Sequence, residues 1–157
     1  MKVSRLTLSD RASAAVYEDL SGPGIERVLN EGGFTVSEWV RIVMPDERHD
    51  IETVLRQLVD EQQVDLILTT GGTGPSPRDV TPEATRAVLE RELPGFGEAM
   101  RMRSFAAVPT AILSRATAGT RGKSLIVNLP GNPKAIGECL PMLLPAIREA
   151  LKHLDGG

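Results

Sequence analysis

Cysteine and aromatic residues are scarce in this chain of 157 residues. The single cysteine, Cys139, cannot form an internal disulfide, and its helical spacing among apolar residues predicts a buried thiol rather than a nucleophile. The core must be mostly aliphatic, because the aromatic residues are only Tyr17, Phe34, Trp39, Phe96 and Phe105.

A strong charge of one sign and a long apolar run are also missing. The net charge is -3, with acidic and basic residues interspersed, which argues against nucleic-acid binding because no basic surface would displace cations from a phosphate backbone. No apolar run approaches the ~20 residues of a membrane span, and the first residues enter a strand rather than a signal peptide. We therefore expect a cytoplasmic protein without a membrane or nucleic-acid partner.

Strand-like and helix-like segments alternate along the chain. Strands are expected at residues 3–8, 34–43, 64–68, 111–118 and 124–129. Helices are expected at residues 21–30, from Asp46 as N-cap to about 59, at 81–91 with Thr81 as N-cap, at 96–105, and from 133 to 154 with interruptions at Pro141 and Pro145. This alternation predicts one α/β domain over residues 1–157, with a mostly parallel sheet covered on both faces.

A glycine-rich run directly follows the apolar stretch 64–68. It reads Thr69-Thr70-Gly71-Gly72-Thr73-Gly74-Pro75-Ser76-Pro77-Arg78-Asp79-Val80-Thr81-Pro82. Such a run lets a ligand approach main-chain N–H groups, which predicts a phosphate site at the end of a strand. It has neither the Gly-Lys-Ser/Thr ending of a P-loop nor the Gly-x-Gly-x-x-Gly dinucleotide pattern. The alternative is a tight turn that needs its glycines for packing alone.

Carboxylates follow several of the expected strands. Ligands of open α/β sheets bind beyond the carboxyl ends of the strands, where Asp10, Asp46 and Asp79 should gather. An acid beside a phosphate is favourable when a cation lies between them, which points to Mg²⁺ held by Asp46 and Asp79. The simpler interpretation of Asp46 is that it caps the start of the following helix. Asp10 is either a third edge carboxylate or a turn residue.

Basic and histidine residues give weaker signals. Arg78 and Arg115 either pair with phosphates or form surface ion pairs. His49 and His153 have no matched His or Cys partner, so a zinc site is improbable.

Several segments occur in the order found in one known family. They are Leu8–Ser13 with Val16–Asp19, Pro45–Glu47, Thr69–Pro82, Pro94–Glu98, Ser114–Ala116 and Asn128–Pro133. Each is weak alone, but as an ordered set over nearly the whole chain they resemble the molybdopterin adenylyltransferase family (the MogA type), which is related to the molybdopterin-binding domains of gephyrin and of plant homologues. One departure is the pair Ser4 and Arg5 in the first strand, which is usually apolar in this family. It leaves the exact boundary of that strand open but does not affect the site.

The resemblance implies a three-layer α/β/α fold, a homotrimer and a defined reaction. Such enzymes transfer AMP from ATP to the terminal phosphate of molybdopterin and release pyrophosphate, with Mg²⁺ present. Asp46 and Asp79 would be the catalytic and metal-binding residues. The residues around the substrates would be Ser9, Asp10, Thr70, Gly71, Gly72, Thr73, Gly74, Ser76, Ser114, Pro130, Gly131 and Asn132. The implied protein partners are the molybdate-inserting enzyme and molybdopterin synthase.

Two alternatives to this activity stay open. The first is a non-catalytic molybdopterin-binding paralogue or scaffold domain of the same fold, against which the intact Asp46 and Asp79 count. The second is a general nucleotide-binding enzyme, which would turn over ATP without any pterin.

Overall fold

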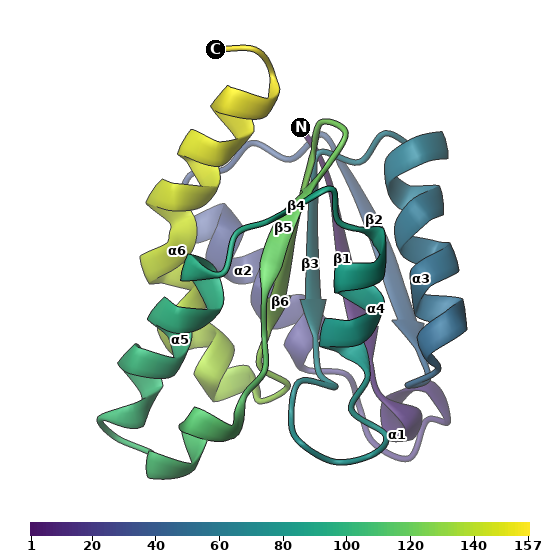
Figure 1. Cartoon of the computed structure of the whole chain (residues 1–157), viewed down its shortest axis with the longest axis vertical. Helices are drawn as coiled ribbons and strands as arrows, with labels where there is room; N and C mark the ends of the chain where they lie inside the picture. Colours follow the sequence, from purple (N-terminus) through teal and green to yellow (C-terminus); the bar gives the residue numbers. More distant parts are fainter.

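A six-stranded sheet forms the centre of the computed structural model, which describes residues 1–157 (Figure 1). The strand order is β2-β1-β3-β6-β5-β4, with β2, β1, β3 and β6 parallel and the short β5 and β4 antiparallel to their neighbours. The bounds are Lys2–Leu8 (β1), Glu38–Met44 (β2), Leu66–Thr70 (β3), Arg91–Glu92 (β4), Ala118–Arg121 (β5) and Ser124–Leu129 (β6).

Helices cover both faces of this sheet, which confirms the three-layer α/β/α prediction (Figure 1). They are α1 (Asp10–Ser13), α2 (Ser21–Glu31), α3 (Arg48–Arg56, continued by a π-helical turn at Gln57–Glu61), α4 (Thr81–Val88), α5 (Gly95–Phe105) and α6 (Pro133–Leu154). Helices α2, α5 and α6 share one apolar cluster with the sheet, and α3 and α4 share another. None of the helices combines the length and the apolar character needed to cross a membrane.

The core is aliphatic, as expected. Alternate residues of each strand face opposite helical layers, so Leu66 and Leu68 join the α2/α6 cluster while Ile67 joins the α3/α4 cluster. Cys139 is buried among apolar residues of α6, which confirms the prediction of a buried thiol.

The first strand includes the two polar residues that depart from the family pattern. Arg5 is buried on the α2 side of the sheet and pairs with Asp19 and Glu26. A buried guanidinium is tolerable because two carboxylates compensate it. Strand β1 therefore begins at Lys2 and is uninterrupted.

The expected strand at residues 111–118 is wrong. Pro109–Leu113 form a 3₁₀ helix whose Ile112 and Leu113 side chains are exposed, and β5 begins only at Ala118. After this 3₁₀ helix the chain bonds to the glycine loop and not to the sheet, since the N–H of Arg115 donates to the carbonyl of Thr73.

Three other boundaries differ from expectation. Strand β2 begins at Glu38, because the N–H of Phe34 still closes the end of α2 on Leu29. Strand β3 lies two residues later than predicted, at Leu66–Thr70. Helix α4 ends at Val88, and Arg91 enters β4.

Helix α6 is continuous, so the predicted interruptions at Pro141 and Pro145 are wrong. Both prolines are exposed, and neither belongs to the buried apolar cluster of this helix. Each removes one backbone donor, a cost that is offset by the buried face formed by Ile136, Cys139, Leu140, Leu143, Leu144 and Ile147.

Candidate functional site

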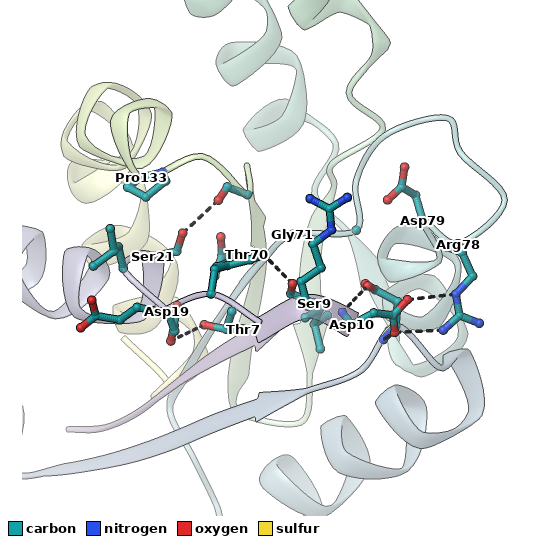
Figure 2. Close-up of a pocket in the computed structure, with 18 residues that line it drawn as sticks. Thr7, Ser9, Asp10, Asp19, Ser21, Thr70, Gly71, Arg78, Asp79 and Pro133 are labelled. Carbon is teal, nitrogen blue, oxygen red and sulfur yellow. Dashed lines mark hydrogen bonds and ion pairs between the residues drawn. The ribbon is translucent and has the colours of Figure 1, made fainter. Parts of the chain in front are cut away.

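A cavity of about 670 Å³ opens where the carboxyl ends of the parallel strands meet (Figure 2). It brings together eight of the predicted site residues: Ser9, Asp10, Asp46, Thr70, Gly71, Gly72, Asp79 and Gly131. These residues come from four separate segments of the sequence. Their convergence at one edge confirms the topological argument, and we call this hollow the first cavity.

Four other predicted residues line a different hollow. Thr73, Ser114, Pro130 and Asn132 face a cavity of about 300 Å³ between α5 and the start of α6, here called the second cavity. Gly74 and Ser76 line neither of the two. The structure therefore divides a set that the sequence had placed around a single pocket.

The two cavities share a wall made of two touching loops. The Thr70 hydroxyl donates to the carbonyl of Pro130 at 2.6 Å, and the N–H of Gly71 donates to the carbonyl of Leu129 at 3.3 Å. A Cβ atom on Gly131 would lie 3.3 Å from the Cα of Gly71. The glycine loop and the 130–132 turn thus stand edge to edge, with one cavity on each side.

The glycine loop has both of the properties that the sequence left as alternatives. Gly71 and Gly72 have φ of 96° and 66°, and a Cβ at these positions would lie 2.3 Å from Leu8 O and Thr81 Oγ1 respectively. Glycine is therefore required for packing. The N–H groups of Gly72, Thr73 and Gly74 nevertheless donate no hydrogen bond within the protein. Of these three residues, Gly72 lines the first cavity and Thr73 lines the second, so their N–H groups are the candidates for binding phosphate.

Thr81 fixes this loop instead of capping α4. Its hydroxyl donates to the carbonyl of Gly71 at 2.8 Å, and its N–H donates to the carbonyl of Gly72 at 3.1 Å. The N-cap position of α4 is occupied by Val80, which has no capping side chain. The predicted capping role of Thr81 is wrong because the hydroxyl points back to the loop.

Asp46 is likewise no helix cap, since Glu47 occupies the N-cap position of α3. Its Oδ2 accepts a hydrogen bond from the N–H of Asp10, while its Oδ1 is buried and has no partner. A Cβ on Gly72 would lie 3.0 Å from that Oδ1, so the unpartnered oxygen faces the glycine loop. Burial raises the pKa of Asp46, and the negative charges of Asp10 and Asp79 raise it further.

The donor set fits a hard divalent cation that is shared with a substrate. An unpartnered buried carboxylate oxygen is costly unless a ligand satisfies it. Asp79 uses Oδ2 to accept from the N–H of Ser76, and its Oδ1 accepts no hydrogen bond. No group of three or more acidic, His or Cys side chains forms a complete metal cage. Mg²⁺ suits such a site because it commonly takes one or two carboxylates and completes its shell with phosphate oxygens and water.

Arg78 closes one side of the first cavity with ion pairs (Figure 2). Its guanidinium donates twice to Asp10, at 3.1 and 3.0 Å, and once to Glu47 at 2.9 Å. The hydrogen bonds from Arg78 hold the pKa of Asp10 below its usual value. Asp10 is thus an edge carboxylate, and its own side chain accepts the N–H of Asp46.

Arg115 has a structural role in the glycine loop. Its guanidinium donates to the carbonyls of Gly74 and Asp79 and pairs with Glu83. These contacts engage each of the three guanidinium nitrogens once, so they favour loop support over the phosphate pairing that the sequence left open.

Sequence reasoning assigned no role to three further residues of the first cavity: Tyr17, Asp19 and Ser21. The Ser21 hydroxyl donates to the carbonyl of Gly131 at 2.9 Å, which ties α2 to the shared wall. Ser21 had been interpreted only as a helix start. Its position two residues before a proline gave no sign of this long-range contact.

Known proteins agree with this architecture. A family model described as "Probable molybdopterin binding domain" matches residues 4–149. The molybdopterin adenylyltransferase of Helicobacter pylori (strain J99) is 58% identical over 142 residues, which are 90% of this chain and 81% of that protein. The enzyme of the same name from Escherichia coli (strain K12) is 51% identical over 153 residues, 98% of this chain and 78% of that protein.

A solved structure gives the same answer in three dimensions. The molybdopterin biosynthesis enzyme MoaB of Thermus thermophilus superposes with a TM-score of 0.89 at 46% identity, covering 99% of this chain and 97% of its own. By sequence and by fold, this chain belongs to the family of molybdopterin-binding domains.

Proposed function

We propose that this protein is a molybdopterin adenylyltransferase, which transfers AMP from ATP to the terminal phosphate of molybdopterin and releases pyrophosphate. One observation carries the proposal: a wall with free amide donors separates two cavities and stands beside the unpartnered oxygen of Asp46. A reaction between two large substrates needs two binding hollows that meet at one point. The relatives that carry this name support the assignment.

The chemistry requires two polyanions to approach each other. A phosphate oxygen of molybdopterin forms a bond to the α-phosphorus of ATP, and the bond from that phosphorus to the β-bridging oxygen breaks, so that pyrophosphate leaves. Positioning and charge neutralisation are the main needs of such a transfer, and no nucleophilic side chain is required. The N–H groups of Gly72 and Thr73, which have no partner in the protein, would supply donors for phosphate oxygens.

Charge neutralisation in the first cavity needs a cation. Its lining includes Asp10, Glu18, Asp19, Asp46 and Asp79 against only Arg11 and Arg78. Asp46 and Asp79 would hold Mg²⁺, which when bound neutralises charge on the ATP phosphates. The second cavity has Arg101 and Lys134 against Glu138, so it is the less acidic of the two. We propose that each cavity holds one substrate and that the phosphates meet at the shared wall.

A homotrimer is part of this proposal. Met102 and Phe105 of α5 and Val108, Ile112 and Leu113 after it are exposed apolar side chains on neighbouring elements. A group of this kind on one surface marks a protein contact. A second copy of this chain is the occupant that we propose, in the cytoplasm, where a molybdate-inserting enzyme would consume the adenylylated product.

Pyrophosphate release tests the function directly. The purified protein should release pyrophosphate from ATP and Mg²⁺ only when molybdopterin is added, in an amount equal to the adenylylated pterin formed. Release without molybdopterin would identify a general ATP-hydrolysing enzyme. Binding of molybdopterin without any release would identify a non-catalytic paralogue, and either result would overturn the proposal.

A further inference from the structure

A short strap, residues 14–20, runs beside the first cavity between α1 and α2. It leaves α1 through a sharp reversal in which Ala15 has a φ of 56°. The N–H of Ala15 donates to Ala12 O at 3.1 Å, and the N–H of Val16 donates to Arg11 O at 2.9 Å. This pair of bonds is a Schellman motif, and it directs the strap toward the cavity.

The far end of the strap is anchored by Asp19. Its carboxylate accepts hydrogen bonds from Arg5 Nη1 at 3.2 Å and from the N–H of Gly22 at 3.1 Å. It also accepts one from Thr7 Oγ1 at 3.0 Å (Figure 2). The Arg5 side chain is only 11% exposed and also pairs with Glu26. The strap is therefore fixed at both ends, and its middle lies over the edge of the cavity.

Tyr17 occupies that middle position. Its Oη lies 2.7 Å from Ser9 Oγ, and Ser9 Oγ in turn accepts the N–H of Ala12 at 3.1 Å. Tyr17 is the only aromatic residue that lines either of the two cavities. The hydroxyl is thus held at one point while the side chain remains 51% exposed.

The strap leaves apolar side chains exposed next to a mostly polar cavity. Tyr17 and Leu20 are both exposed although they line a cavity that consists mostly of polar and charged residues. A ligand made only of phosphate would gain nothing from this surface. A ligand with a flat, partly apolar ring would cover it.

We propose that Tyr17 is a specificity-determining residue whose ring stacks on the planar fused nitrogen heterocycle of the substrate bound in the first cavity. The inference rests on the proposed function, because both substrates of that reaction carry such a ring, adenine in ATP and the pterin in molybdopterin. The bond to Ser9 orients the Tyr17 ring, and the two anchors of the strap fix its distance from the glycine loop. The first cavity offers a planar ligand no other aromatic side chain.

Steady-state kinetics of three variants test the stacking. Stacking of a base on an aromatic ring changes affinity by about tenfold or more, so Tyr17→Ala should raise the KM of one substrate by about that factor. The kcat should change by less than about threefold, because a ring that stacks on a part of the substrate outside the reacting bond binds ground and transition states equally. Tyr17→Phe keeps the ring and loses only the bond to Ser9 that orients it, so its KM should stay within about threefold of the parent.

Val16→Ala is the matched control, because Val16 lies on the same strap, is more exposed than Tyr17 and does not line the cavity. It should leave both KM values unchanged. A rise confined to ATP identifies adenine as the stacked ring, and a rise confined to molybdopterin identifies the pterin. Equal rises for both substrates, or a loss in Tyr17→Phe as large as in Tyr17→Ala, would overturn the proposal.

Ring-proton NMR gives a readout that does not require turnover. Tyr17 is the only tyrosine of the chain, so tyrosine-selective labelling yields one set of ring signals. Adding ATP or molybdopterin alone should move these signals upfield by ring-current shielding. Signals that move with neither compound would overturn the stacking even in an active enzyme. If the Tyr17 signals move but the protein transfers no adenylyl group, the stacking stands and only the proposed function is contradicted.

Discussion

Asp10 and Asp46 exchange hydrogen bonds across the carboxyl edge of the sheet. The N–H of Asp10 donates to the Asp46 carboxylate at 3.0 Å, and the N–H of Asp46 donates to the Asp10 carboxylate at 3.0 Å. This reciprocal pair joins the end of β1 to the end of β2. It leaves one oxygen of Asp46 buried and free to bind a ligand.

Replacing Asp46 should therefore abolish transfer without unfolding the protein. In Asp46→Asn the amide oxygen can still accept the N–H of Asp10, but the charge that would hold a cation is lost. We expect kcat to fall by at least about 100-fold, with molybdopterin affinity largely kept, because charge stabilisation of this kind is worth several kcal/mol.

Asp79→Asn should have the same effect, since its free Oδ1 is the second proposed metal ligand. Asp50→Asn is the matched control, because Asp50 is an exposed carboxylate of α3 outside both cavities. Full activity in both site variants would refute the roles of Asp46 and Asp79.

Gly72→Ala should damage stability and activity together. The residue has a φ of 66°, and its Cβ would lie 2.3 Å from the Thr81 hydroxyl that holds the loop. We expect a loss of about 1–3 kcal/mol in the free energy of unfolding, measured by urea denaturation.

Gly137→Ala serves as the control for Gly72→Ala. Its Cβ would meet no atom within 4 Å, and alanine is favoured over glycine inside a helix by about 1 kcal/mol. This variant should be as stable as the parent or more so. Equal losses at both positions would mean that the loop geometry is not the cause.

Ala15→Gly should stabilise the protein. Ala15 has a φ of 56°, a conformation that costs an L-residue about 1–2 kcal/mol, and glycine removes this strain while adding some entropy to the unfolded chain. We expect a net gain of about 0.5–1 kcal/mol in the free energy of unfolding. Ala14→Gly, at a φ of -86°, should give no gain. Stabilisation by both substitutions would contradict the explanation.

Glu26 should make part of the stability dependent on pH. Hydrogen bonds from Arg41, and secondly from Arg5, hold the pKa of Glu26 below its usual value near 4.5. A carboxylate with a lowered folded-state pKa stabilises the fold above its unfolded pKa and loses that contribution as the pH falls through the folded value. The parent should therefore be more stable than Glu26→Gln by the full contribution of this carboxylate near pH 6. That difference in the free energy of unfolding should shrink below pH ~4.5.

The apolar group on α5 and the 3₁₀ helix predicts the oligomeric state. Ile112 is 62% exposed in the single chain and lies within this group. Analytical ultracentrifugation should find a trimer for the parent and smaller species for Ile112→Glu, because a buried unpaired charge is costly at an interface. Ser13→Glu, on an exposed position of α1, should remain trimeric. A monomeric parent protein would refute the trimer.

The sequence predicted the parallel core well, for physical reasons. Strands such as β3 are buried on both faces and read as continuous apolar runs. The same signal failed at residues 111–118, because a surface-exposed 3₁₀ helix there has the composition of a buried strand. The prolines of α6 led to a wrong prediction of helix interruptions. Both lie on the exposed face of the helix, which local sequence does not reveal.

The order of the strands alone predicted which loops would gather at the candidate site. Loops after parallel strands gather at one edge, so Asp10, Asp46 and the glycine loop were expected together. The division into two cavities depends on how two loops touch, which only the folded chain shows. The strap carrying Tyr17 was missed because its reversal uses alanine at Ala15, where glycine would have given the usual signal.

The wall of two touching loops between the cavities has an evolutionary consequence. A Cβ at Gly131 would press on Gly71 in the neighbouring loop, so we expect a substitution there to move the wall and to alter both cavities at once. Adaptation toward a different nucleotide or a different pterin should therefore appear in the outer linings, such as the Tyr17 strap, while the wall itself stays unchanged.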